Sequence, residues 1–139
     1  MGSLYAPDFN TKLLHMAAAG NAWSEDYSAT AAPENGDKFY LGVIPAGVRV
    51  YEVRLKHGAA GASATAKLGF EPFDGDDPTA DDDYWLAATT SVAAAGVERS
   101  SAAAVTFNRP VKLVLTAGGA DHASGTYEVV VVGKTVGAP

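Results

Sequence analysis

Apolar and polar positions alternate in short runs along most of the chain, a pattern that predicts β-strands rather than helices. An aromatic and apolar run covers residues 39–44, a Pro-Ala-Gly turn follows, and the alternation resumes over residues 48–55. Its phase then changes, because Val48 and Val50 share one face whereas the next apolar positions share the other (Tyr51, Val53 and Leu55). Such a slip reverses every side chain unless a bulge absorbs it. We therefore predict a bulge or bend near Val50–Tyr51, from which one strand could serve two sheets.

Further short runs extend this pattern to the end of the chain. They predict strands over residues 63–70, 84–88, 105–107, 111–116 and 126–132, separated by Gly-rich or Pro-containing turns. In the last of them Val129 to Val132 is apolar on both faces, as in a central strand or one covered by a partner. Seven or eight short strands at this spacing predict an all-β fold, an antiparallel β-sandwich or barrel, with a jelly-roll-like sandwich the first choice.

Residues 1–36 lack this periodicity. Asn10 is placed to cap a short helix over residues 11–19, although the same residues would serve an extended arm. We divide the chain into an N-terminal arm, 1–36, and a β-sandwich domain, 37–139. The arm's aromatic side chains either pad one edge of the chain's own sandwich or dock on a neighbouring subunit, two alternatives of similar weight (Tyr5, Phe9, Trp23 and Tyr27).

Charge is concentrated in one segment. Seven of the 16 acids and no base lie between Glu71 and Asp83, and the remaining acids are balanced by the ten bases. The chain lacks the basic patch that nucleic-acid binding requires and any apolar run long enough for a membrane helix. It contains no cysteine, which excludes disulfides, thiolate metal sites and cysteine nucleophiles.

The acidic segment is the first candidate for chemistry. Calcium takes six to eight oxygen ligands, and Asp74, Asp76 and Asp77 are the residues best placed to supply them. The spacing does not match an EF-hand, because Thr79 and Trp85 stand where Gly and Glu belong. A solvated acidic loop is the preferred interpretation, and we expect no metal or cofactor.

Catalytic signals are weak elsewhere. Asp121, His122 and Ser124 carry the side chains of a hydrolase triad but lie in one Gly-rich loop, whereas a triad converges from separate elements. His15 and His57 have no partner at ligand spacing and are interpreted as ordinary surface or edge residues. We therefore expect a protein that is not an enzyme and has no catalytic residue.

Residues 39–55, with the sequence FYLGVIPAGVRVYEVRL, resemble a segment of small virion proteins of tailed double-stranded-DNA bacteriophages. The similarity continues through the Ala-Lys-Leu-Gly sequence at 66–69, the acidic loop leading into residues 81–89 (DDDYWLAAT), and the Val-rich strand at 127–132. It covers about residues 37–132, and its motifs are structural.

This resemblance implies a capsid cement or decoration protein with a jelly-roll-like fold. Such a protein binds the outer surface of the capsid and clamps contacts between subunits of the major capsid protein, here as a homodimer or homotrimer. It would be made in the host bacterial cytoplasm and reside in the virion, with Tyr5, Phe9, Trp23 and Tyr27 as interface anchors. The alternative is a carbohydrate- or calcium-binding sandwich module of a phage tail or fibre, with Tyr84 and Trp85 forming a sugar platform beside the acidic loop.

Overall fold

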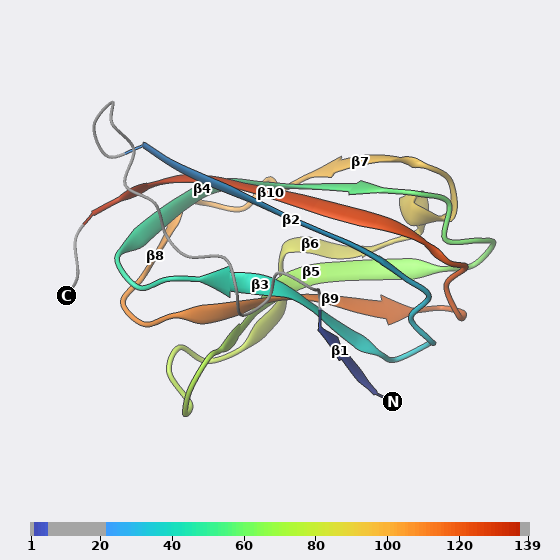
Figure 1. Cartoon of the computed structure of the whole chain (residues 1–139), viewed down its shortest axis with the longest axis horizontal. Coiled ribbons are helices and arrows are strands. Elements are labelled where there is room, and N and C mark those ends of the chain that lie inside the picture. Colours follow the sequence, from blue (N-terminus) through green and yellow to red (C-terminus); the bar gives the residue numbers. More distant parts are fainter. Residues whose placement is uncertain (1, 6–21, 137–139) are drawn as a thin grey trace.

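Two five-stranded β-sheets, here sheets A and B, pack face to face in the computed structural model, which describes residues 2–5 and 22–136 (Figure 1). The strands of sheet A lie in the order β1 (Ser3–Tyr5), β3 (Lys38–Ile44), β9 (Val111–Gly118), β5 (Thr65–Pro72) and β6 (Asp81–Thr89). Those of sheet B lie in the order β2 (Ala22–Ala31), β10 (Gly125–Thr135), β4 (Val48–His57) and β7 (Gly96–Arg99), and β8 (Val105–Phe107) also pairs with β4. A 3₁₀ turn, η1 (Thr90–Ala93), connects β6 to β7.

The strand pairing is nested. The first long strand, β2, pairs with the last, β10; β3 pairs with β9; β4 pairs with β7 and β8; and β5 pairs with β6. All these pairs are antiparallel, and they alternate between the two sheets. A long hairpin folded over itself in this way is a jelly roll. The predicted all-β, jelly-roll-like antiparallel sandwich is confirmed.

The core lies between the sheets and is built by alternating side chains. On β9, Val111, Leu113 and Leu115 are completely buried on the inner face, and Val129 and Val131 occupy the same layer from β10. β10 lies between β2 and β4, so the prediction of a central strand is confirmed. Burial of this apolar layer is the main stabilising contribution to the fold.

The predicted phase slip in β4 is a β-bulge. The pairing with β10 jumps from Glu52↔Val132 to Val50↔Gly133, which leaves Tyr51 without an opposing residue. Tyr51 is therefore exposed, and the apolar positions on both sides of it face the same core (Val48, Val50, Val53 and Leu55). The bulge is confirmed, but β4 pairs only with strands of sheet B, so the expectation that it serves two sheets is wrong.

The segment predicted to be a separate arm contributes strands to both sheets. β1 pairs with β3, and β2 pairs with β10 over ten residues, so β2 is an integral strand of the jelly roll. Trp23 and Tyr27 point into the sandwich, where Tyr27 donates a hydrogen bond across to the Val43 carbonyl of sheet A (2.8 Å). Gly42 makes room for this ring, since a Cβ there would overlap it. The predicted helix at 11–19 and Phe9 lie outside the described residues.

The other predicted strands are present with small changes in length. The sequence does not predict β7, because Ala94, Ala95 and Gly96 at its start show no alternation of apolar and polar residues. Among the described residues, no helix is long or apolar enough to cross a membrane.

Candidate functional site

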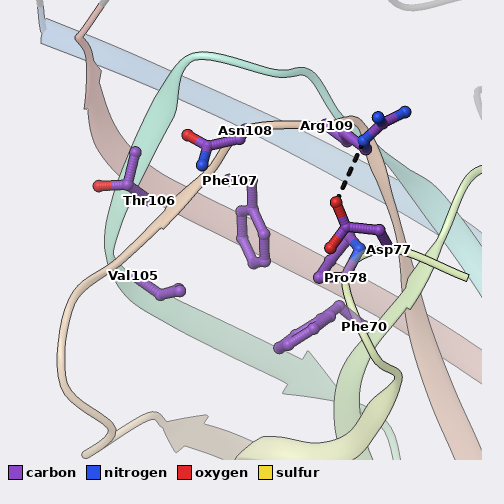
Figure 2. A pocket seen from close by; sticks show the side chains of 8 residues that line it. All are labelled: Phe70, Asp77, Pro78, Val105, Thr106, Phe107, Asn108 and Arg109. Carbon is purple, nitrogen blue, oxygen red and sulfur yellow. Dashed lines mark ion pairs between the residues drawn. The ribbon is translucent and has the colours of Figure 1, made fainter. Parts of the chain in front are cut away.

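A pocket of about 140 Å³ opens at the end of the sandwich where β8 turns into β9 (Figure 2). Its walls come from three separate segments: β5, the acidic loop, and the stretch that includes β8 and the β8–β9 turn (Phe70, Asp77, Pro78, Val105, Thr106, Phe107, Asn108 and Arg109). Figure 2 shows the Phe70 and Phe107 rings at its base, below the Arg109–Asp77 pair. We call this the β8–β9 pocket.

The base of the pocket is rigid because it belongs to the core. Phe70 and Phe107 are 7% and 2% exposed, and their rings meet edge-to-face with centroids 5.0 Å apart. Trp85 packs edge-to-face against both rings, with centroid separations of 5.7 and 6.1 Å. Tyr84 contacts Phe70 and Trp85 in turn and donates a hydrogen bond to the Ala103 carbonyl (2.7 Å). The aromatic cluster supports the base and keeps it from collapsing.

The rim of the pocket is polar and solvent-exposed. Arg109 Nε lies 3.1 Å from an Asp77 carboxylate oxygen, and the two side chains are 65% and 77% exposed. The turn itself is held by backbone hydrogen bonds, from Gly47 N–H to the Phe107 carbonyl (2.8 Å) and from Phe73 N–H to the Pro110 carbonyl (3.1 Å). Phe73 is 40% exposed beside this turn. An apolar base within a charged rim suits a protruding side chain of another molecule.

The carboxylates that lie close together are at the start of β6, and they are not the three candidates considered for calcium. Asp74, Asp76 and Asp77 are exposed, and the group with mutually close oxygens is Asp81, Asp82 and Asp83, within 4.8 Å of one another. A hydrogen bond with Asp83 raises the pKa of the Asp81 carboxyl, and Lys67 lies 3.3 Å from Asp82. A solvated acidic loop without a metal stays the prediction, and calcium binding by Asp74, Asp76 and Asp77 stays the less favoured alternative.

A second polar cluster lies on sheet A around Glu71. Lys38 Nζ and the Tyr40 hydroxyl donate to its carboxylate at 2.7 and 2.9 Å, and Lys112 Nζ lies 3.8 Å away. Burial opposes ionisation of Glu71, but the Lys38 and Tyr40 hydrogen bonds outweigh it and hold the pKa of this carboxyl below its ordinary value. Burial and the neighbouring Glu71 raise the pKa of Tyr40 to about 12.

His122 is a structural residue in this arrangement. It is 4% exposed, its Nε2 donates to the Thr65 carbonyl (2.8 Å), and its Nδ1 lies 2.7 Å from the Tyr127 hydroxyl. The Asp121 carboxylate accepts from Asn35 N–H (2.8 Å), and Ser124 is exposed. Of the three side chains named as a weak triad candidate, Asp121 and His122 thus take different partners and Ser124 faces solvent.

His57 was interpreted as a surface or edge residue, and this is wrong. Its side chain is fully buried, with Nε2 2.9 Å from a Glu98 carboxylate oxygen and Nδ1 3.1 Å from the Gly58 carbonyl oxygen. A pocket of about 320 Å³ lies beside it (Lys56, His57, Gly58, Thr126 and Glu128). The missed signal was the alternation itself, which puts His57 on the same face as Val53 and Leu55.

The four aromatic residues predicted to lie at an interface differ in where the structure places them. Trp23 and Tyr27 are 4% and 2% exposed within the chain's own core, so they are not available as anchors for a neighbour. Tyr5 is 56% exposed and stacks on Tyr40 with ring centroids 5.0 Å apart. Phe9 lies outside the described residues. The sugar platform is also incomplete, because Trp85 is 4% exposed beneath Phe70 and Phe107.

Comparison with known proteins finds similarity in structure alone. No protein-family model matches the chain, and no curated protein matches it. A chain of the capsid of Ralstonia phage GP4 superposes with a TM-score of 0.73 at 19% identity, covering 99% of both chains. A chain of the cyanophage Pam1 capsid gives 0.63 at 18% identity (93% of this chain, 99% of that one), and one from the acid-stable capsid of Helicobacter pylori bacteriophage KHP30 gives 0.61 at 19% (82% and 89%).

These similarities are at the level of the fold. The jelly roll seen here is the fold of those chains over nearly their whole length, so they are proteins of similar size with no large additional domain. The sequence resemblance to small phage virion proteins and the structural similarity therefore point to the same fold.

Proposed function

We propose that this chain is a structural virion protein that decorates a phage capsid, binding its outer surface and stabilising contacts between major capsid subunits. The observation that carries the proposal is the superposition, over 99% of both chains, on a chain of the Ralstonia phage GP4 capsid. Two further phage capsids contain chains of the same fold and similar extent. A jelly roll of this size that forms a whole chain of a capsid is a separate component of that capsid.

The physical properties of the chain suit such a role. A protein that clamps a seam requires a rigid body and binding surfaces, and a closed sandwich with an aromatic core provides the first. Weak contacts suffice at each surface, because several contacts made by one oligomer add avidity without a new contact type. We propose a homodimer or homotrimer on the shell, with Tyr5 and Phe9 as interface residues and the virion as the location of the mature protein.

The proposal is tested with heads of the source phage that lack this protein. Purified protein is added to them, free protein is removed by density-gradient centrifugation, and the bound fraction is measured. We expect saturable binding and a higher temperature of DNA release, detected with an intercalating dye. Failure to co-sediment at any concentration reached would exclude the decoration role.

The alternative of a carbohydrate- or calcium-binding module in a tail or fibre has less support, since Trp85 is buried. It predicts heat of binding in calorimetric titrations with calcium or a glycan panel. A decoration protein without a metal predicts a flat titration with both, together with binding to heads.

A further inference from the structure

We infer that the β8–β9 pocket is a socket for one apolar side chain of the shell protein, carried on a segment with a neighbouring Lys or Arg. The inference rests on the proposed function and adds to it a place on this chain and a chemistry for the partner. Three properties of the pocket carry it: a preformed base, its size, and the charge around its mouth.

The base is preformed. Phe70 and Phe107 are held in place by Trp85, and β5 and β8 belong to different sheets, so a shift of either ring disturbs the core. Thr106 is fixed from outside, since Arg49 Nη1 donates to its hydroxyl (3.3 Å). A site that needs no reorganisation loses less free energy on binding than one that must first be ordered.

The size selects the class of occupant. Small-molecule sites usually enclose roughly 300–1,000 Å³, and this pocket encloses about 140 Å³. A branched aliphatic side chain or a methionine fits such a space. The base offers ring carbons from Phe70 and Phe107 and the aliphatic groups of Val105 and Pro78, so a polar side chain would lose hydration there without replacement. Buried anchors of this kind dominate the energy of protein interfaces.

The negative charge of the acidic loop favours a basic residue next to the apolar side chain that enters the pocket. Asp74, Asp76 and Asp77 are exposed on the loop that forms one wall, and Arg109 is the one base among the residues lining the pocket. Arg109 pairs with Asp77, which lines the pocket, so the excess negative charge of this loop comes from Asp74 and Asp76, which are exposed on the loop outside the pocket lining. A segment with Lys or Arg beside its apolar side chain complements this wall, and the attraction weakens as salt is raised.

The first test fills the pocket. Val105→Trp places an indole over Phe70 and Phe107, and the matched control, Val97→Trp, adds the same ring to β7 at a position that is 55% exposed and lies beside Lys56. On heads of the source phage that lack the protein, we expect Val105→Trp to bind about tenfold more weakly or worse and Val97→Trp to bind like wild type. Undiminished binding of folded Val105→Trp, with its thermal transition intact, would overturn the inference.

A second measurement covers the case in which Val105→Trp does not fold. Because the chain has no cysteine, Asn108→Cys provides a single attachment point on the exposed rim for a benzophenone maleimide. We expect irradiation on heads to cross-link this position to the shell protein, whereas the same label at Val97→Cys gives a much lower yield. Cross-links to another copy of this chain, or to nothing while Val97→Cys is efficient, would overturn the socket for a shell side chain.

The outcomes separate the two proposals. If wild-type protein does not bind heads, the decoration role fails and the socket fails with it. If wild type binds while the filled pocket and the label at 108 have no effect, the decoration role stands and the socket alone is wrong.

Discussion

At the end of the sandwich where β4 runs into Gly58, the contacts between segments are made by two buried histidines, His57 and His122. At the opposite end, an exposed ion pair joins the acidic loop to the β8–β9 turn. His122 connects the β9–β10 loop to β5 and β10, and His57 connects β4 to Glu98 of β7. Both imidazoles are removed from water. At the other end, Arg109 and Asp77 are more than half exposed. They lie beside a pocket with an aromatic base (Figure 2).

The difference is one of free energy. Breaking a buried hydrogen bond leaves a desolvated donor or acceptor without a partner, at a cost of roughly 1–3 kcal/mol. An exposed ion pair typically contributes only about 0–1 kcal/mol, since water replaces either partner. The histidine end therefore contributes to folding stability, whereas the pocket end can change its surface with little effect on the fold. Binding surfaces commonly develop on the second kind of region.

The largest effect is expected for His122→Ala. The substitution leaves the Thr65 carbonyl and the Tyr127 hydroxyl buried without this partner and opens a cavity, so it should lower the free energy of unfolding by about 3 kcal/mol. Urea denaturation monitored by tryptophan fluorescence measures the change. Tyr127→Phe is the matched control, because it removes only the hydroxyl and should cost about 1 kcal/mol. A loss below about 0.5 kcal/mol for His122→Ala would show that the loop does not depend on this residue.

A smaller effect at the same end follows from pH. Burial raises the pKa of Tyr127 to about 12 from an ordinary value of 10.0, so the unfolded chain releases this proton before the folded one. The contribution of protonated Tyr127 to the free energy of unfolding is fully present below pH 10 and is lost as the pH rises from 10 toward 12. Urea titrations at pH 9, 10 and 11 should show this decline.

Tyr127→Phe is the control for the pH dependence as well. The free energy of unfolding of this variant should decline less steeply over the same pH range. The remaining decline comes from Tyr40, whose pKa is also raised to about 12. Equal slopes for the variant and wild type would mean that Tyr127 ionises alike in the folded and unfolded chains.

The sequence contained enough information for most strands and for the bulge. The runs at β3, β4, β9 and β10 are strongly apolar and alternate, and tertiary contacts did not have to override them. The phase slip located the bulge at Tyr51 because side-chain direction reverses with every residue of a strand. A single sequence therefore indicated where β4 departs from regular geometry.

β2 was harder to predict because its inward face is mixed. Trp23, Tyr27 and Ala29 alternate correctly, but Glu25 stands between them, and the outward positions are short and polar. The pattern is that of an edge strand with one half-polar face, which periodicity alone does not separate from an irregular arm. β2 is recognised as a strand only through its pairing with β10, about a hundred residues later in the chain.

The candidate site was not predictable from local sequence. Phe70, Pro78 and Phe107 come from three segments that share no motif, and they meet because β5 and β8 lie in opposing sheets. The same reason explains why Asp121 and His122, adjacent in sequence, have partners on other segments: Asp121 binds Asn35, and His122 binds Thr65 and Tyr127. Side-chain partners in loops are set by topology, and a motif within one loop says little about them.

The smallest effect is expected for Arg109→Ala, and it tests the other half of the comparison. Both members of the pair are more than half exposed, so the substitution should change the free energy of unfolding by no more than about 0.5 kcal/mol. A double-mutant cycle with Asp77→Ala measures the coupling directly. A coupling above about 1 kcal/mol would mean that the ion pair anchors the acidic loop as firmly as the histidines anchor theirs, and the two ends would then not differ in kind. A weak coupling leaves the rim of the β8–β9 pocket free to exchange the Arg109–Asp77 contact for contacts with a partner.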